Sequence, residues 1–323
     1  MKAKTLCSML FVAVMMMAVA PLELSARTLG MVADNATNSV TVFDADTHAI
    51  LGTVPIPRSF FIGDVLITSD LKQGFVTNIN PQVHVIDLTT SPPSLATGTN
   101  PIPSSTNFGM DLSISRDGKF LIMTSAGATE PVAYPISVID IAARAEASTF
   151  FTGDNFSSSD VCSDGSVLVT TIAHSESPES DTVRRLTLSG TGALTDTGEV
   201  LSIINPFDVY CAPGAQSGVT ITFFEGVTSF SIPGLGPVDS RSLSGNDGIS
   251  GAINPAGNRV FMRSDNPGSI DVFDFNSATG ELGASPLFTF SVESSASGFS
   301  GLGIDQIALH PNGGKLFVSE PNA

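Results

Sequence analysis

The sequence has few basic residues: 14 Lys and Arg stand against 31 Asp and Glu, which gives a formal net charge of −17. No basic run interrupts this acidity, and a chain of that charge repels phosphate at long range, so nucleic acid is excluded as a partner. Charged residues of both signs make up only 14% of the chain, against roughly a quarter in an average soluble protein. Ser, Thr and Asn must fill the remaining polar positions, which favours strands and turns over helices.

Histidine is also scarce, which argues against a metal or haem centre. The four imidazoles, His48, His84, His174 and His310, lie in separate parts of the chain without the spacing of a metal site. The sequence has no Cys-x-x-Cys-His haem attachment and no Gly-x-Ser-x-Gly nucleophile elbow. We therefore predict no metal and no cofactor.

Long hydrophobic runs are missing except near the start of the chain. Lys2 and Lys4 precede an apolar run over residues 9–20, and the small residues Ser25 and Ala26 follow it. This layout predicts a signal peptide over residues 1–26, cleaved after Ala26, and a secreted, periplasmic or cell-surface protein. The run has 12 residues, whereas a membrane-spanning helix needs about 20, so no transmembrane anchor is expected.

The rest of the chain, residues 27–323, is built from repeats. Turn-like clusters between apolar runs recur every 43 to 56 residues. A second series, in phase with the first, consists of alternating apolar strands that end in Asp, at residues 40–44, 83–87, 137–140 and 270–274. The turn clusters are marked by Asp70, Asp117, Asp164, Pro213, Ala256 and Asn312.

One unit shows the strand content most clearly. Residues 111–115, 120–124, 136–140 and 147–151 read as four short strands, with an Asp-Gly turn between the first two. No segment keeps the helical spacing of apolar residues over the length of a helix. The fold class is therefore all-β, a β-propeller of four-stranded antiparallel blades, with six complete blades or seven of which the last is incomplete.

The closure of the ring is ambiguous in the sequence. The first unit supplies a second, third and fourth strand, while residues 305–310 and 315–320 supply a first and a second strand. Six blades with a redundant end and a seventh, incomplete blade both fit. We favour the incomplete blade, because residue 323 comes where a third strand would begin. A free strand edge there would be open to association.

Several units resemble a known repeat. Gly-Met-Val-Ala-Asp-Asn at 30–35, Asn-Ser-Val-Thr-Val-Phe-Asp-Ala at 38–45 and Ile-Leu-Gly-Thr-Val-Pro-Ile at 50–56 are similar to one unit of the YVTN-type β-propeller repeat. Val-Phe-Asp-Phe at 272–275 with Thr-Gly-Glu-Leu at 279–282 resembles the related lactonase family, which is 6-phosphogluconolactonase-like. The resemblance implies the propeller fold and leaves binding, surface and hydrolytic activities open.

Carboxylates near the start of successive inner strands are the main candidate site. In a ring they would surround one mouth of the central channel and could attract a cation or a basic ligand. Alternatively, they accept backbone N–H bonds and fasten one blade to the next. The candidate ligand-binding residues at this mouth are Asp64, Asp111, Asp160, Asp208 and Asp305, with His310 at a neighbouring inner-strand position.

The mature chain keeps two cysteines, Cys162 and Cys211, each three residues before the glycine of its turn. Equivalent positions on adjacent blades lie close together, so a disulfide between two blades is compatible with the spacing. Two buried thiols are the alternative. His310 is expected at the position that these cysteines occupy, and so near the axis.

Arg184 and Arg185 stand out among so few cations. Together with His174 they could hold an anionic substrate, or they could pair with nearby Glu176, Glu179 and Asp181 at the surface.

The sequence thus predicts an exported propeller that acts as a binding or scaffold module for a protein or a small-molecule ligand, and not primarily an enzyme. The alternative is a secreted lactonase-like hydrolase that uses the channel mouth. No catalytic residue can be assigned from the sequence.

Overall fold

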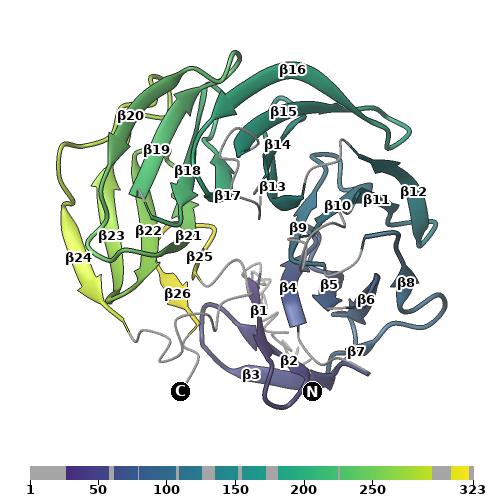
Figure 1. Ribbon diagram of the computed structural model, residues 1–323. Coiled ribbons are helices and arrows are strands. Elements are labelled where there is room, and N and C mark those ends of the chain that lie inside the picture. The colour runs from purple at the N-terminus through teal and green to yellow at the C-terminus, as the bar shows by residue number, and fades with distance from the viewer. Residues whose placement is uncertain are drawn as a thin grey trace, which may run out of the picture.

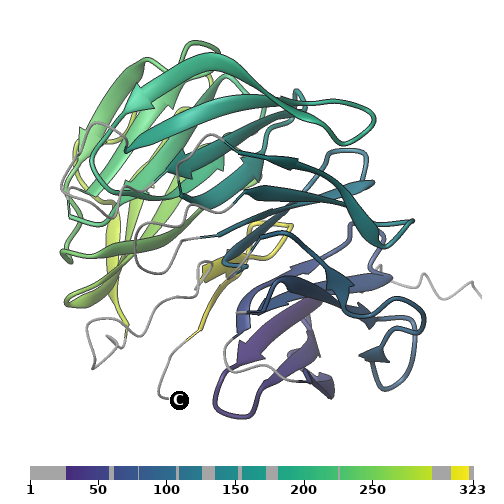
Figure 2. The ribbon, with the colours of Figure 1, turned by 45° about the vertical axis from the view of Figure 1, so that its right-hand side comes forward.

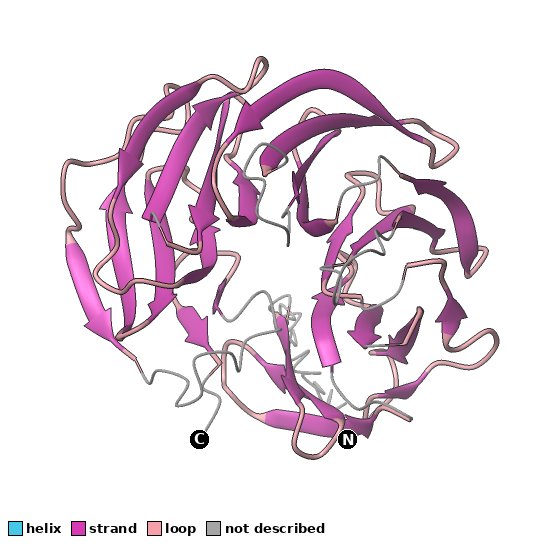
Figure 3. Ribbon diagram, in the orientation of Figure 1, coloured by secondary structure: helices cyan, strands magenta, loops and turns pink. Residues whose placement is uncertain are grey.

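A computed structural model of the chain describes residues 27–57, 62–78, 80–106, 109–125, 135–151, 155–171, 181–224, 226–292 and 307–319. Within these ranges all regular structure is β-strand, and no helix occurs (Figure 3). The predicted leader, residues 1–26, lies outside the described residues.

The strands form six antiparallel blades around a central axis, each blade built from consecutive strands (Figure 1). Blade 1 is β1 (Leu29–Asp34), β2 (Ser39–Asp44) and β3 (Ile50–Pro55), which correspond to the second, third and fourth strands of the other blades. Blade 2 is β4 (Ile62–Ile67), β5 (Gln73–Asn78), β6 (Gln82–Asp87), β7 (Ser94–Leu95) and β8 (Ile102–Pro103). Blade 3 is β9 (Asp111–Ile114), β10 (Phe120–Thr124), β11 (Ile136–Asp140) and β12 (Ala145–Phe150).

The second half of the ring repeats the same plan. Blade 4 is β13 (Phe156–Val161), β14 (Ser166–Thr171), β15 (Thr182–Leu188) and β16 (Leu194–Ser202). Blade 5 is β17 (Pro206–Cys211), β18 (Ser217–Thr222), β19 (Gly226–Ser231) and β20 (Pro237–Arg241). Blade 6 is β21 (Gly248–Ile253), β22 (Arg259–Asp265), β23 (Gly268–Asp274) and β24 (Phe288–Ser291).

A seventh sheet of two strands stands between blade 6 and blade 1. It consists of β25 (Ile307–Leu309) and β26 (Leu316–Val318), and both views show it in yellow between the green and purple strands (Figures 1 and 2). These strands pair with each other and not with β1–β3. The C-terminal strands therefore do not complete the first blade; they begin a further one.

The third strands of blades 2 and 3, β6 and β11, are covered on both faces, which explains their largely apolar sequences. In β6, Val83 and Val85 pack against Leu121 and Met123 of blade 3. Ile86 of the same strand lies in the cluster that blade 2 shares with blade 1. The core of the protein is thus a series of apolar layers between successive blades.

The Asp that ends the third strand has a local role. The carboxylate of Asp44 accepts the backbone N–H groups of Asp46 at 3.0 Å and Thr47 at 2.8 Å. Asp87 and Asp140 bind the turns that follow them in the same way. A side chain that satisfies the N–H groups of its own turn favours that turn, so the recurring Asp marks where each third strand stops.

Candidate functional site

The inner strands β4, β9, β13, β17 and β21 line the central axis (Figure 1). Each is the edge of its sheet, so the N–H groups on its free side have no partner in a strand ladder. Asp64 Oδ2 accepts the N–H of Leu112 at 2.9 Å, and Asp111 Oδ2 accepts the N–H of Ser159 at 2.6 Å. Both carboxyl groups therefore tie their blade to the next one.

Blade 4 departs from this pattern. A backbone hydrogen bond closes the turn after each inner strand, with Ser115 as acceptor in blade 3 and Cys162 as acceptor in blade 4. Asp111 lies four residues before its acceptor, and the residue four positions before Cys162 is Ser158, not Asp160. Ser158 Oγ donates to Asp208 of blade 5. Asp160 lies two residues nearer the turn, where its Oδ2 accepts the N–H of Cys211 at 2.7 Å. Asp160 therefore lies farther along its inner strand than Asp64 and Asp111 do along theirs, although it also joins two blades.

Tyr210 takes part in the contact between blades 5 and 6, and sequence reasoning missed it. Its hydroxyl donates to Asp208 Oδ2 and accepts the N–H of Gly251 at 2.5 Å. In blades 2 and 3 the inner-strand carboxylate binds the next blade's N–H directly, whereas the Tyr210 hydroxyl bridges Asp208 and the N–H of Gly251. The chain has only two tyrosines, and a phenol two residues after Asp208 in an inner strand was the one available signal.

Replacing Tyr210 with Phe tests this contact. The Tyr210→Phe variant leaves the buried N–H of Gly251 without its acceptor and removes a donor from Asp208, so we expect unfolding to cost about 1–3 kcal/mol less than in the wild type. Denaturant unfolding measures this difference, and faster hydrogen exchange at the Gly251 amide would locate it. Unchanged exchange at Gly251 would contradict the assigned role of the hydroxyl.

Burial raises the pKa of the four described carboxyl groups on the inner strands, which are Asp64, Asp111, Asp160 and Asp208. This effect exceeds the opposite effect of the hydrogen bonds that these groups accept. The pKa of Asp64 rises to about 7, and those of Asp160 and Asp208 rise to about 6. The pKa of Asp111 is raised well above its usual value by burial and then by the carboxyl groups of Asp64 and Asp208. The channel therefore changes its charge near neutral pH.

A cavity of about 330 Å³ opens onto Asp111, Asp160 and Asp208. Leu66 and Val161 contribute apolar surface, while Asp160 is the most accessible of the carboxyl groups. Ser113 Oγ and Ser159 Oγ lie 2.8 Å apart and add hydroxyl groups to the wall. The full lining is Leu66, Asp111, Leu112, Ser113, Ile114, Ser159, Asp160, Val161, Asp208, Val209 and Tyr210.

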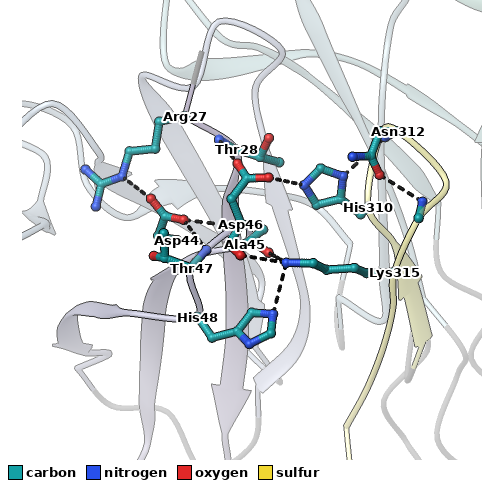
Figure 4. A network of polar contacts seen from close by, with 11 residues as sticks. Arg27, Thr28, Asp44, Ala45, Asp46, Thr47, His48, His310, Asn312 and Lys315 are labelled. Carbon is teal, nitrogen blue, oxygen red and sulfur yellow. Dashed lines mark hydrogen bonds and ion pairs between the residues drawn. The ribbon is translucent and has the colours of Figure 1, made fainter. Parts of the chain in front are cut away.

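His310 lies away from this cavity. His310 accepts the hydrogen bond that closes the turn after its strand, as Cys162 and Ala212 do in blades 4 and 5. The position equivalent to His310 in blade 5 is therefore Ala212, one residue after the expected Cys211. His310 is buried, and its Nε2 lies 3.1 Å from Asp46 Oδ1 of blade 1 (Figure 4). His310 does not line this cavity, because its ring joins the seventh sheet to blade 1. Asp305 lies outside the described residues.

Lys315 completes this contact, which we call the closure network: Ala45, Asp46, His48, His310 and Lys315. The ammonium group of Lys315 donates to the carbonyl oxygens of Ala45 at 3.0 Å and Asp46 at 2.6 Å, and lies 3.2 Å from His48 Nε2 (Figure 4). Side chains, rather than paired strands, thus close the ring at this point.

Arg184 and Arg185 lie on β15, the third strand of blade 4. Arg184 pairs with Asp196 at 3.3 Å, and Arg185 pairs with Asp164 at 3.0 Å and Glu199 at 3.1 Å. The predicted surface pairing is found, but with other acidic residues than those proposed. Asp181 instead accepts the N–H of Asn205 at 2.9 Å. The other two proposed acidic partners, Glu176 and Glu179, lie outside the described residues, as does His174.

Cys162 and Cys211 form a disulfide between blades 4 and 5, with their Cα atoms 5.2 Å apart. Cys162 is buried among Leu168, Val183 and Val209. The bond lies beside the contact between Asp160 and the N–H of Cys211, so a covalent and a polar link join the same two inner strands.

Within the described residues, no group of three or more His, Cys, Asp and Glu side chains is arranged to hold a metal ion. A search of the same residues for a long apolar helix able to cross a bilayer finds none.

The chain is a β-propeller, and comparison with solved structures gives that fold many relatives. A functionally unknown protein from Desulfotomaculum acetoxidans is 20% identical, with a TM-score of 0.74 over 90% of this chain and 89% of that one. A candidate 6-phosphogluconolactonase from Bacteroides fragilis is 14% identical, with a TM-score of 0.70 over 93% and 89%. Hydrazine synthase from Kuenenia stuttgartiensis is 17% identical, with a TM-score of 0.68 over 88% and 86%.

Such identities establish the likeness of the fold alone. No family model and no curated protein matches the sequence, so the YVTN-type resemblance of the repeats remains a prediction.

Proposed function

We propose that the protein is an exported β-propeller that binds a ligand in its channel cavity and serves as a binding or scaffold module. The observation that carries the proposal is the cavity itself, which inner strands of four successive blades enclose. Backbone donors hold Asp111 and Asp160 in its wall, so the polar groups are fixed before a ligand arrives. A preformed wall reduces the entropy cost of binding. The signal-peptide pattern of residues 1–26 supports export.

The lining indicates the chemistry of the ligand. Leu66, Ile114 and Val161 would cover an apolar body, while the carboxyl group of Asp160 and the hydroxyl of Ser113 would meet hydrogen-bond donors. A volume of about 330 Å³ lies at the lower end for small-molecule sites. We infer a small ligand that carries an amine or several hydroxyl groups, and a cationic one would bind more tightly above the pKa of Asp160, which is about 6.

The alternative is lactone hydrolysis. It would need an acid–base group and an anion-binding group within hydrogen-bond reach of one substrate position. Arg184 and Arg185 are paired on β15, and His310 is engaged with Asp46. Among the described residues these groups do not converge on the cavity, which favours binding over hydrolysis.

A ligand screen tests the proposal. The mature protein, residues 27–323, is to be screened by thermal shift against amines, amino acids, sugars and lactones, with hydrolysis of the lactones followed in parallel. We expect stabilisation by a small amine or polyol that is lost in Leu66→Trp, because the indole fills the cavity. Val200→Trp, on the outer strand β16, is the matched control and should keep binding.

Two outcomes would contradict the proposal. Ligand binding that survives Leu66→Trp would place the site elsewhere. Lactone turnover that disappears in Asp111→Asn would favour the hydrolase instead.

A further inference from the structure

The face of blade 6 that is turned toward the seventh sheet is only partly covered by that sheet. Ile270 and Val272 of β23 form an apolar cluster with Ile307 of β25 and with Leu316 and Val318 of β26. This cluster fixes which face of blade 6 meets the seventh sheet.

Farther from the axis, the same face carries two exposed aromatic rings. Phe290 pairs with Ile270 and Phe288 pairs with Val272 across strands β23 and β24. Directly opposed residues of antiparallel strands have their side chains on the same face, so both rings face the seventh sheet. The two rings stack with their centroids 6.4 Å apart, and Phe288 is 61% and Phe290 51% exposed. No described strand covers them.

Blade 1 presents a matching surface from the other side. Phe43 of β2 contacts Phe317 of β26, with ring centroids 5.5 Å apart. Ile50 of β3 is directly opposite Phe43 and therefore lies on the same face. Its side chain is 73% exposed. Both neighbours of the seventh sheet thus turn apolar side chains toward the position where its outer strands would be.

Strand β26 forms the back of this space. Among the described strands it pairs only with β25, so the backbone groups of its outer edge are not part of a ladder. In blades 2 to 6 the second strand is followed at that edge by a third strand. We call the space bounded by β26, Phe288, Phe290 and Ile50 the outer slot.

We propose that the outer slot binds an extended segment of a partner protein, which adds to β26 as a third strand. The third strand of blade 6 defines the segment: seven extended residues, as in β23, whose Ile270, Val272 and Phe273 are buried. Backbone hydrogen bonds to β26 would provide affinity, and side chains in alternation would contact the blade 6 and blade 1 surfaces. In a second copy the described third strands are already built into blades, which favours a segment of a separate protein as the occupant. This surface is separate from the channel cavity.

A peptide with the sequence of residues 268–274, labelled with a fluorophore, is the probe. We expect saturable binding to the mature protein in fluorescence anisotropy. The same peptide with Ile270→Pro and Val272→Asp is the control, because it loses a strand hydrogen bond and an apolar contact. Equal binding of both peptides, or no binding of the first, would overturn the proposal.

Variants of the protein locate the peptide. Phe290→Asp and Ile50→Asp change exposed residues on opposite walls of the outer slot, and each should weaken binding at least tenfold. Phe224→Asp is the matched control, because this ring is 65% exposed but follows β18 in blade 5. Equal weakening by Phe224→Asp would overturn the proposal. So would self-association of the protein that Phe290→Asp and Ile50→Asp abolish, since it would make a second copy the occupant.

Discussion

The free energy of unfolding is expected to fall as the pH rises from 5 to 8. Burial raises the pKa of Asp64 to about 7 and those of Asp160 and Asp208 to about 6, and it raises that of Asp111 as well. In the unfolded chain these groups titrate near 3.8. Between the two values the folded protein binds more protons, so stability is greatest at low pH and is lost as the pH rises through the folded values.

One buried histidine acts in the opposite direction. Burial lowers the pKa of His84 to about 4 from 6.5, so its contribution is lost as the pH falls through that range. Four carboxyl groups outweigh one imidazole. A change of one in a pKa corresponds to about 1.4 kcal/mol, so even a fraction of the carboxyl effect lowers the melting temperature by several degrees. Denaturant unfolding at pH 5, 6, 7 and 8 measures the profile.

Two variants distinguish the effect of a buried channel carboxyl group from that of a surface carboxyl group on the pH dependence of stability. Asp64→Asn removes a buried titrating group, so its unfolding free energy should depend less on pH over this range. Asp117→Asn should leave the profile unchanged, because Lys119 and Ser115 lower the pKa of Asp117 to about 2. A wild-type profile that is flat or rises toward pH 8 would contradict the assignment of the buried carboxyl groups.

Loss of the disulfide is expected to have an effect of similar size. The bond between Cys162 and Cys211 spans 49 positions and links two inner strands. A loop of that length restricts the unfolded chain by about 4 kcal/mol in the chain-entropy model. We expect the variant with both Cys162→Ala and Cys211→Ala to melt roughly 5–10 °C below the wild type.

Reductant provides the control for the disulfide. Added dithiothreitol should lower the melting temperature of the wild type and leave that of the double variant unchanged. A wild type whose melting temperature does not respond to reductant after unfolding and refolding in its presence would show that the bond contributes nothing to stability.

The regular part of the fold could be predicted from the sequence because it depends on local patterns. The third strands end at Asp44, Asp87, Asp140 and Asp274, and each of these positions repeats the same alternation. Fourth strands were harder, because they lie at the rim and are only half covered. In blade 2 the fourth strand is divided into β7 and β8, a division that no apolar pattern announces.

The site was less predictable because its contacts join different blades. Asp64 and Asp111 repeat in register and could be found. Asp160 could not be placed, because blade 4 has Ser158 at the repeating position and a carboxyl group two residues later. The bridge that Tyr210 makes between Asp208 and Gly251 depends on the distance between two neighbouring inner strands. That distance cannot be read from the spacing of residues along the chain.

The closure network sets the order in which the ring can form. His310 and Asp46 are 264 positions apart, and Lys315 and Ala45 are 270 apart, whereas each blade is made of consecutive strands. Contacts of long sequence separation form late. During synthesis the early blades can therefore assemble before the end of the chain has emerged, and the ring stays open until Lys315 is available. An arc that has not yet closed leaves apolar surface exposed on its end blades, and this is the stage at which the chain is most prone to aggregate.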